Sequence, residues 1–246
     1  MKCIFCLTTN SSKFNTIEHI LPESLGGGDW ALLPPGMYCD SCQNKFGSSI
    51  EQQALADFPL VNYRTLLGVP TKKGKAPWFK YMEGSIYSAG APGRIIYQPN
   101  EIFKKAYETG QKKLTIVPAM TNKPDMVLRT LLKMGIELIA CDEGPYNVFD
   151  EIYDPARKYA LSGEKTYPWF YLQRNDTQKL NLLLQGKLEE NDPSGEVNMS
   201  ILIHEGVEVF HLQLMYLQFF VPLYENVFMG PELKIDEPLE QLIVVN

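Results

Sequence analysis

Four of the five cysteines in this 246-residue chain occur in two Cys-x-x-Cys pairs, with 32 residues between them. Each pair can supply two thiolates at neighbouring corners of a tetrahedron. This spacing predicts a structural zinc site made by Cys3, Cys6, Cys39 and Cys42. Zn²⁺ held by four thiolates has no position open to substrate, so we expect it to stabilise a segment too small to fold on its apolar core alone. Cysteines used for metal rather than for disulfides indicate the cytoplasm.

An acid and a histidine, Glu18 and His19, stand side by side between the two cysteine pairs. The residues around them predict a short strand, on which neighbouring side chains point to opposite faces. The two side chains can therefore act on one substrate only if the strand ends or bulges there, which Pro22 and the glycines at 26–28 permit. A Glu-His pair alone is more often an ordinary surface pair. Its position between two metal-binding pairs of cysteines favours a catalytic site.

The order Cys-x-x-Cys, Glu-His-x-x-Pro-x-x-x-Gly-Gly, Cys-x-x-Cys resembles a zinc-containing subgroup of the HNH endonucleases, which have the ββα-metal fold. The resemblance covers about residues 1–80. It implies that Glu18 helps to hold a catalytic divalent cation, Mg²⁺ or Mn²⁺, and that His19 is the general base that activates water. The family has Asn or His directly after the last cysteine, where this chain has Gln43 followed by Asn44. Either the Gln43 carbonyl oxygen or, after a shift of one residue, Asn44 completes the cation site, and we favour Asn44.

The net charge of −6 conceals a basic segment. Residues 64–113 contain ten Lys and Arg residues against three acids, so the rest of the chain is strongly acidic. A basic band suits a protein that meets phosphates on one side, although a solvated lysine-rich loop has the same composition. Together with the nuclease resemblance, the charge predicts a nucleic-acid partner, DNA rather than RNA. The lysines expected to contact its phosphates are Lys45, Lys72, Lys73 and Lys75.

The pattern of apolar and turn-forming residues predicts an α+β protein of three units. Residues 1–60 form the zinc-stapled HNH module, with a short helix at 50–56. Residues 61–113 have a proline or glycine every few positions, which predicts an irregular basic connector packed on the module. Residues 114–246 predict an α+β domain that chooses the target or a protein partner, or forms a homo-oligomer. Its expected helices are 124–141 and 154–161, and its expected strands are 169–173, 198–204 and 207–213, the last two joined in a hairpin at 205–206.

Several other residues have competing interpretations. His204 and His211 flank the predicted hairpin and are expected to be ordinary sheet residues. The apolar runs 219–223 and 242–245 predict core or interface strands. The aromatic residues at 78, 79 and 81 lie among the lysines, where they either pack on the module, the more common case, or stack on unpaired bases.

Together these features predict a soluble, cytoplasmic endonuclease that hydrolyses phosphodiester bonds. No run approaches the ~20 apolar residues of a membrane span, and the first residues do not form a secretory leader. The resemblance suggests a role in bacterial or phage defence. Two alternatives stay open. One is a zinc-stapled nucleic-acid-binding protein whose nuclease site has decayed, which the Gln43 substitution permits, and the other is an RNA-cleaving effector.

Overall fold

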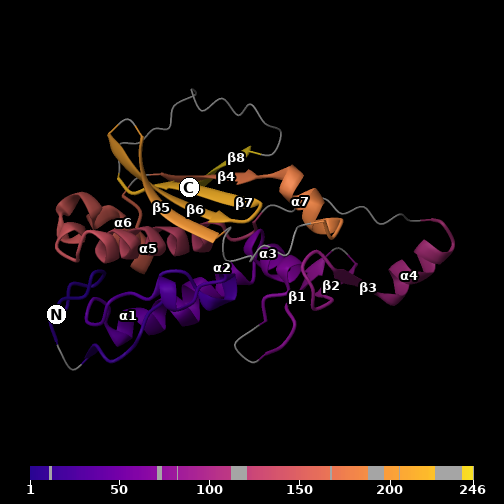
Figure 1. Cartoon of the computed structure of the whole chain (residues 1–246), viewed down its shortest axis with the longest axis horizontal. Coiled ribbons are helices and arrows are strands. Elements are labelled where there is room, and N and C mark those ends of the chain that lie inside the picture. The colour runs from indigo at the N-terminus through magenta and orange to yellow at the C-terminus, as the bar shows by residue number, and fades with distance from the viewer. Residues whose placement is uncertain are drawn as a thin grey trace.

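The computed structural model describes residues 1–10, 13–70, 74–81, 83–111, 121–166, 168–187, 197–204, 206–224 and 240–245. Helices and strands are both present, so the protein is α+β, as predicted. A five-stranded sheet lies over the helices α5 (Pro124–Asp142) and α6 (Asp154–Ser162), and the N-terminal helices lie on the other side of α5 (Figure 1). In the part of the chain that is described, no helix is long and apolar enough to cross a membrane.

The N-terminal module consists of loops followed by one helical segment. Two 3-10 turns, η2 (Glu23–Leu25) and η3 (Asp29–Ala31), precede α1 (Asp40–Lys45), η4 (Phe46–Glu51) and α2 (Gln52–Leu55). The last three elements follow one another directly, and η4 is a π-helical turn. The hydroxyls of Ser48 and Ser49 donate to carbonyls four residues back, which competes with regular helical hydrogen bonding. The short helix predicted at 50–56 is therefore the end of a longer helical segment.

The segment 61–113 is more regular than the irregular connector expected from its sequence. It contains α3 (Leu60–Leu67) and then a three-stranded antiparallel sheet of β1 (Trp78–Tyr81), β2 (Gly84–Ser88) and β3 (Ile95–Pro99), followed by α4 (Glu101–Glu108). Its glycines mostly stand at the ends of these elements. Gly68 ends α3 with φ of 73°, and Gly90 and Gly93 turn the chain between β2 and β3 with φ of 82° and 73°. Strands of four or five residues need turns this often, so frequent turn residues do not exclude a sheet.

The C-terminal half contains the helices and strands that were predicted. Two 3-10 turns, η5 (Asn147–Phe149) and η6 (Glu151–Tyr153), precede α6. The elements that follow α6 are β4 (Trp169–Asn175), α7 (Thr177–Leu184), β5 (Val197–His204), β6 (Val207–Leu214), β7 (Leu217–Pro222) and β8 (Glu240–Val245). The strand order is β5-β6-β7-β4-β8, with every neighbouring pair antiparallel. The hairpin pairs Val197 with Leu214 and His204 with Val207, while Glu205 of its predicted turn lies outside the described residues. Both predicted apolar runs contain strand residues, of β7 and β8.

Helix α5 is the centre of the molecule. Fourteen of its 19 residues are buried, because it packs against the five-stranded sheet on one side and against η4 and α2 on the other. Gly135 permits the close approach to the sheet, since a Cβ atom there would lie 2.8 Å from Cδ2 of Leu223 and 3.0 Å from Cβ of Phe210. One continuous core, which includes Phe46, Leu128 and Phe219, therefore runs from the cysteine-containing module to the sheet.

The start of α5 is fixed by a residue of the N-terminal segment. Oδ2 of the buried Asp57 accepts hydrogen bonds from the backbone N–H groups of Asn122, at 2.8 Å, and Lys123, at 2.7 Å. The hydroxyl of Thr121 donates to the same oxygen at 2.7 Å. A carboxylate at this end of a helix also interacts favourably with the helix dipole. Asp57 therefore ties α5 to the module.

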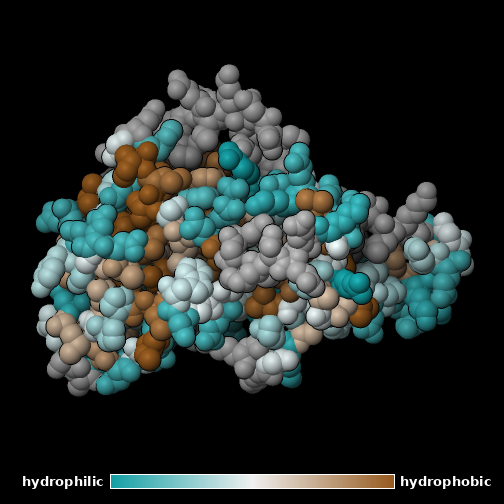
Figure 2. Space-filling model, viewed as in Figure 1, coloured by the Kyte–Doolittle hydropathy of each residue, from teal (hydrophilic) through white to brown (hydrophobic). Residues whose placement is uncertain are grey.

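The surface is polar over most of the face seen in Figure 2, including the end that carries α4. Apolar residues gather near the tip of the β5–β6 hairpin (Figure 2), where Leu202 and Ile203 of the edge strand β5 are 40% and 68% exposed. His204 follows them on the same strand and His211 lies on β6, so both histidines are sheet residues, as expected. The ring of His211 stacks on Phe220 with centroids 4.5 Å apart.

Candidate active site and zinc centre

The four cysteines of the two pairs form one cluster, as the sequence predicts. Their four sulfur atoms all lie within 4.8 Å of one another, and the Sγ atoms of Cys6 and Cys39 are 3.5 Å apart. Sulfurs that surround Zn²⁺ as a tetrahedron with Zn–S bonds of about 2.3 Å are about 3.8 Å apart. A hydrogen bond from Cys42 lowers the pKa of Cys3 to about 5, which favours the thiolate, the form that binds zinc. The cluster therefore fits a structural zinc site.

Glu18 and His19 lie on a very short antiparallel pair of segments. The N–H of Leu33 donates to the carbonyl of Glu18 at 2.9 Å, and the N–H of Ile20 donates to the carbonyl of Ala31 at 2.8 Å, with His19 bridged to Leu32 between them. After Pro22 the chain turns through η2 and η3. Gly27 is required in this loop, because a Cβ there would lie only 1.8 Å from the carbonyl oxygen of Leu21.

Two polar contacts from α1 hold the segment that leads to Glu18. The carboxylate of Asp40 accepts hydrogen bonds from the backbone N–H groups of Asn15, at 2.9 Å, and Thr16, at 3.1 Å. Hydrogen bonds from the side chain and backbone of Asn15, and then from Thr16, lower the pKa of Asp40. The side-chain amide of Gln43 donates to the carbonyl of Ile17 at 3.0 Å. The position of Glu18 is thus set from the helix that contains Cys42 and directly follows Cys39.

One open pocket of about 790 Å³ brings the predicted catalytic residues together. We call it the active-site pocket; Glu18, His19, Gln43 and Asn44 all line it. The side chain of His19 is 26% exposed, and its Nε2 lies 3.9 Å from Oε1 of Glu23, which is beyond hydrogen-bonding distance. Because the antiparallel pair is only a few residues long, the neighbours Glu18 and His19 both reach this pocket. Lys45 is exposed at the end of α1 and is not among the residues that line it.

Residues 3–59 match the family model described as HNH endonuclease. This segment is similar to HNH endonucleases, and we call it the HNH module. The match ends at Pro59, so it includes the cysteine cluster, Glu18, His19 and the helical segment from α1 to α2. Neither the comparison with characterised proteins nor that with solved structures found a match to the chain.

A buried ion cluster, which was not predicted from the sequence, joins the HNH module to α5. Nζ of Lys133, which has no exposed surface, lies 2.7 Å from Oε1 of Glu18 and 2.8 Å from Oε1 of Glu51. It also lies 3.0 Å from Oε2 of Glu137, four residues further along the same helix. Both Glu18 and Glu51 line the active-site pocket. One carboxylate predicted to hold a cation is therefore paired with an ammonium group from the other half of the chain.

The charges in this cluster depend on one another. Burial alone would lower the pKa of Lys133, but the carboxylates of Glu137, Glu51 and Glu18 raise it well above its usual value, so the ammonium stays charged. Burial, together with the negative charges of Glu18 and Glu51, raises the pKa of Glu137 well above its usual value in spite of Lys133. The charged Lys133 therefore faces the two carboxylates that line the pocket, Glu18 and Glu51.

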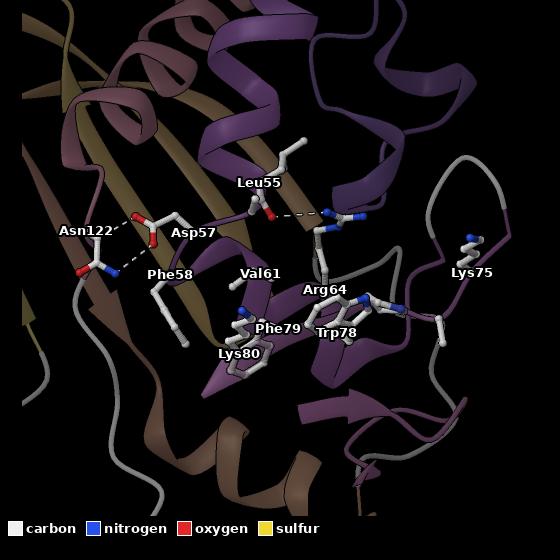
Figure 3. A pocket seen from close by; sticks show the side chains of 13 residues that line it. Leu55, Asp57, Phe58, Val61, Arg64, Lys75, Trp78, Phe79, Lys80 and Asn122 are labelled. Carbon is white, nitrogen blue, oxygen red and sulfur yellow. Dashed lines mark hydrogen bonds between the residues drawn. The ribbon is translucent and has the colours of Figure 1, made fainter. Parts of the chain in front are cut away.

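A second pocket, of about 570 Å³, adjoins the active-site pocket and shares Leu55, Ala56 and Arg64 with it. Figure 3 shows Arg64 reaching towards the carbonyl of Leu55, to which its Nη1 donates at 3.4 Å, with Lys75, Lys80 and Trp78 on the surrounding wall. Burial lowers the pKa of Arg64, yet a guanidinium stays charged at neutral pH. The second pocket is therefore basic. Of the lysines predicted to bind phosphates, Lys72 and Lys73 lie outside the described residues.

The aromatic residues of β1 differ in their surroundings. Phe79 and Tyr81 are buried in a small cluster with Val61 and Ile86, so these two rings pack inside the protein and are not available to bases. Trp78 is 50% exposed and stacks on Tyr87, with ring centroids 5.7 Å apart and an interplanar angle of 21°. Trp78 also lines the second pocket, so one aromatic ring remains accessible beside the basic side chains.

Proposed function

We propose that this chain is a metal-dependent HNH endonuclease that hydrolyses phosphodiester bonds in DNA, with His19 as general base. The observation that supports it most directly is the convergence of Glu18, His19, Gln43 and Asn44 on one open pocket. Apart from Arg64, the residues that line this pocket lie in the segment that matches the HNH endonuclease family, which also contains the four-cysteine cluster.

In the proposed reaction, His19 accepts the proton of the attacking water. The water oxygen bonds to phosphorus while the bond from phosphorus to the 3′ oxygen breaks, and the departing oxygen takes a proton from solvent water. The products are a 5′-phosphate and a 3′-hydroxyl, as the family resemblance implies. The partial exposure of the His19 side chain leaves it accessible from the pocket. A positioned general base typically accelerates such a step about 10²- to 10⁴-fold.

The pocket offers oxygen atoms of the kind that hard divalent cations prefer. These are the Glu18 carboxylate and the side-chain amide oxygens of Asn44 or Gln43. We assign Glu18 and Asn44 to Mg²⁺ or Mn²⁺, with Gln43 as the alternative to Asn44, because the amide nitrogen of Gln43 is already engaged with Ile17. A bound cation would neutralise negative charge on the phosphate and on the departing oxygen. With so few protein ligands, we expect weak cation binding in the absence of nucleic acid.

Basic residues near the pocket suit a polyanionic substrate. Arg64 and Lys80 line the second pocket together with Lys75, and Lys45 is exposed on α1. Contacts of this kind neutralise phosphates without reading bases, so affinity should fall as salt concentration rises. We propose that Lys45 and Lys75, with Lys72 and Lys73 of the same basic segment, bind the phosphates that flank the cleaved bond.

The test is a cleavage assay on plasmid DNA, single-stranded DNA and RNA with Mg²⁺ or Mn²⁺. The wild-type chain should nick DNA, and His19→Ala should lower the rate about 10²- to 10⁴-fold without weakening DNA binding. His204→Ala, which removes an exposed histidine of β5, is the matched control and should cleave as the wild type does. Absence of cleavage by the wild type with either cation, or equal rates for His19→Ala and the wild type, would refute the proposal.

One observation favours a second candidate function, a nucleic-acid-binding protein without cleavage. Glu18 is paired with Lys133, and the amide of Gln43 is engaged with Ile17, so both positions have structural partners. A protein of this kind would bind DNA equally with and without His19, and no cation would induce nicking. Preferential digestion of RNA in the same assay would instead identify an RNA-cleaving effector.

We further propose a role in bacterial or phage defence, on the sequence resemblance alone. A nuclease can protect a cell in this way only while its active site is intact. Cells that express the wild-type chain should therefore reduce phage plating, whereas cells that express His19→Ala should not. Equal plating on the two strains would argue against this role.

A further inference from the structure

The ammonium group of Lys133, which lies outside the HNH module, contacts two carboxylates that line the active-site pocket. We propose that Lys133 is a positioning residue of the nuclease site, which holds Glu18 and Glu51 side by side in the wall of the pocket. This inference rests on the proposed nuclease function and adds two residues to it, one of them outside the segment that matches the HNH family.

The contacts of Lys133 point beyond its own helix. Glu137, four residues away on α5, already offers it one buried carboxylate. The other two contacts reach separate elements of the module, since Glu18 lies in the short antiparallel pair and Glu51 is the last residue of the π-helical turn η4. Buried ion pairs give little net stability compared with apolar packing, so stability alone is a weak reason to place an ammonium here.

The geometry suits an indirect role. Lys133 is fully buried and does not line the pocket, whereas Glu18 and Glu51 do. Each of these carboxylates meets Nζ through Oε1, so its second oxygen is the one left to serve the pocket. The rings of Tyr38 and Phe46, with centroids 5.8 Å and 6.0 Å from Nζ, close the apolar side of the site. Carboxylates that bind a metal ion are commonly oriented by hydrogen bonds from residues that do not themselves touch the metal.

Charge gives a second reason for the arrangement. Two carboxylates that approach the same point repel each other, and each is partly removed from water. The Lys133 ammonium offsets this repulsion, so Glu18 and Glu51 can lie side by side in the wall of the pocket. Without it, the two side chains should separate, and the pocket should bind a divalent cation less well.

The test replaces Lys133 in a way that keeps the fold. Lys133→Met alone leaves three carboxylates without their partner, so we pair it with Glu137→Met, because apolar residues of similar volume often replace a buried ion pair at little cost. Glu51→Gln is a second, milder variant on the pocket wall. Arg129→Met is the matched control, since Arg129 is a buried cation of α5 that donates to the carbonyls of Ala160 and Leu161, at the end of α6. Binding of Mn²⁺ to each zinc-loaded protein is followed by electron paramagnetic resonance, together with circular dichroism, zinc content and the Mn²⁺ dependence of nicking.

We expect Lys133→Met/Glu137→Met and Glu51→Gln to bind Mn²⁺ about 10- to 100-fold more weakly than the wild type, and to need correspondingly more Mn²⁺ for nicking. Their zinc content and circular dichroism should not change, and Arg129→Met should bind Mn²⁺ as the wild type does. Wild-type Mn²⁺ binding by both pocket variants would overturn the role of Lys133. A wild-type chain that cleaves no nucleic acid would overturn the proposed function, while the Mn²⁺ titration would still decide the role of Lys133 independently.

Discussion

Asp57 offers a quantitative test of how the HNH module is joined to α5. Its Oδ2 atom accepts two backbone hydrogen bonds at the start of α5 and one from the Thr121 hydroxyl, and the residue is 8% exposed. Asp57→Ala removes this acceptor and leaves two N–H groups without their partner. Asp57→Asn keeps one oxygen that can accept the same hydrogen bonds, and it removes only the charge.

Hydrogen bonds to a charged group contribute about 1.5–3 kcal/mol each. Three of the four hydrogen bonds that Asp57 accepts share a single oxygen, and the fourth, from the side-chain amide of Asn122 to Oδ1, is long at 3.5 Å. Asn122 and Lys123 are exposed enough for water to replace part of the loss. We therefore expect Asp57→Ala to lower the free energy of unfolding by about 3–5 kcal/mol. For a chain of this size that corresponds to a fall in Tm of about 10 °C. Asp57→Asn should cost about 1–2 kcal/mol, because only the charge is lost.

The free energies are measured by guanidinium denaturation of the zinc-loaded proteins. Asp176→Ala is the control, since Asp176 caps α7 with a single hydrogen bond, from the N–H of Lys179 at 3.0 Å, and its loss should cost about 1 kcal/mol. The reasoning is refuted if Asp57→Ala is no more destabilising than Asp176→Ala. It is also refuted if Asp57→Asn costs as much as Asp57→Ala.

Three further predictions concern zinc, packing and pH. Cys42→Ser should reduce bound zinc from about one ion per chain to none and lower helical circular dichroism, and retention of zinc in a metal assay would contradict the four-cysteine site. In Gly135→Ala, overpacking should lower the free energy of unfolding by about 1–3 kcal/mol, and the higher helix propensity of alanine should offset about 1 kcal/mol of that loss. Gly47→Ala is the control, because no atom lies within 4 Å of its added Cβ, and it should not be destabilised in the same denaturation assay. Burial lowers the pKa of His211, so its contribution to stability is complete above the unfolded pKa and is lost as pH falls through the folded pKa. The Tm of the wild type should therefore fall more between pH 7 and pH 5 than that of His211→Gln, and parallel melting curves would contradict this.

Much of the C-terminal fold could be read from the sequence because its signals are local. Pro124 at the start of α5 and the apolar residues that follow it indicate a helix, and alternation in β5 and β6 indicates strands. The segment 61–113 was predicted wrongly for a physical reason. Its short strands have little periodicity of their own and are defined by pairing, such as that of Phe79 with Ile86 and of Ile86 with Tyr97. Pairing between strands cannot be read from either strand alone.

The candidate site divides in the same way. The cysteine cluster and the predicted pocket residues could be found from the sequence, because they belong to short motifs within the first 44 residues of the chain. Lys133 was missed because its contact with Glu18 spans 115 residues and depends on how α5 packs on the module. A faint signal was present. Arg129, Lys133 and Glu137 recur every four residues in an otherwise apolar helix, which places three charges on one buried stripe.

The continuous core also constrains how such a chain can change over generations. A catalytic module with its own core can be joined by recombination to a new recognition domain, because separating it from its old neighbour exposes little apolar surface. A cut after the HNH module here would expose Phe46 and the other apolar residues that α5 covers, and would separate Glu18 from Lys133. The module and α5 should therefore be inherited together. New specificities would then arise by change in surface loops and in the exposed edge of β5, and not by exchange of whole domains.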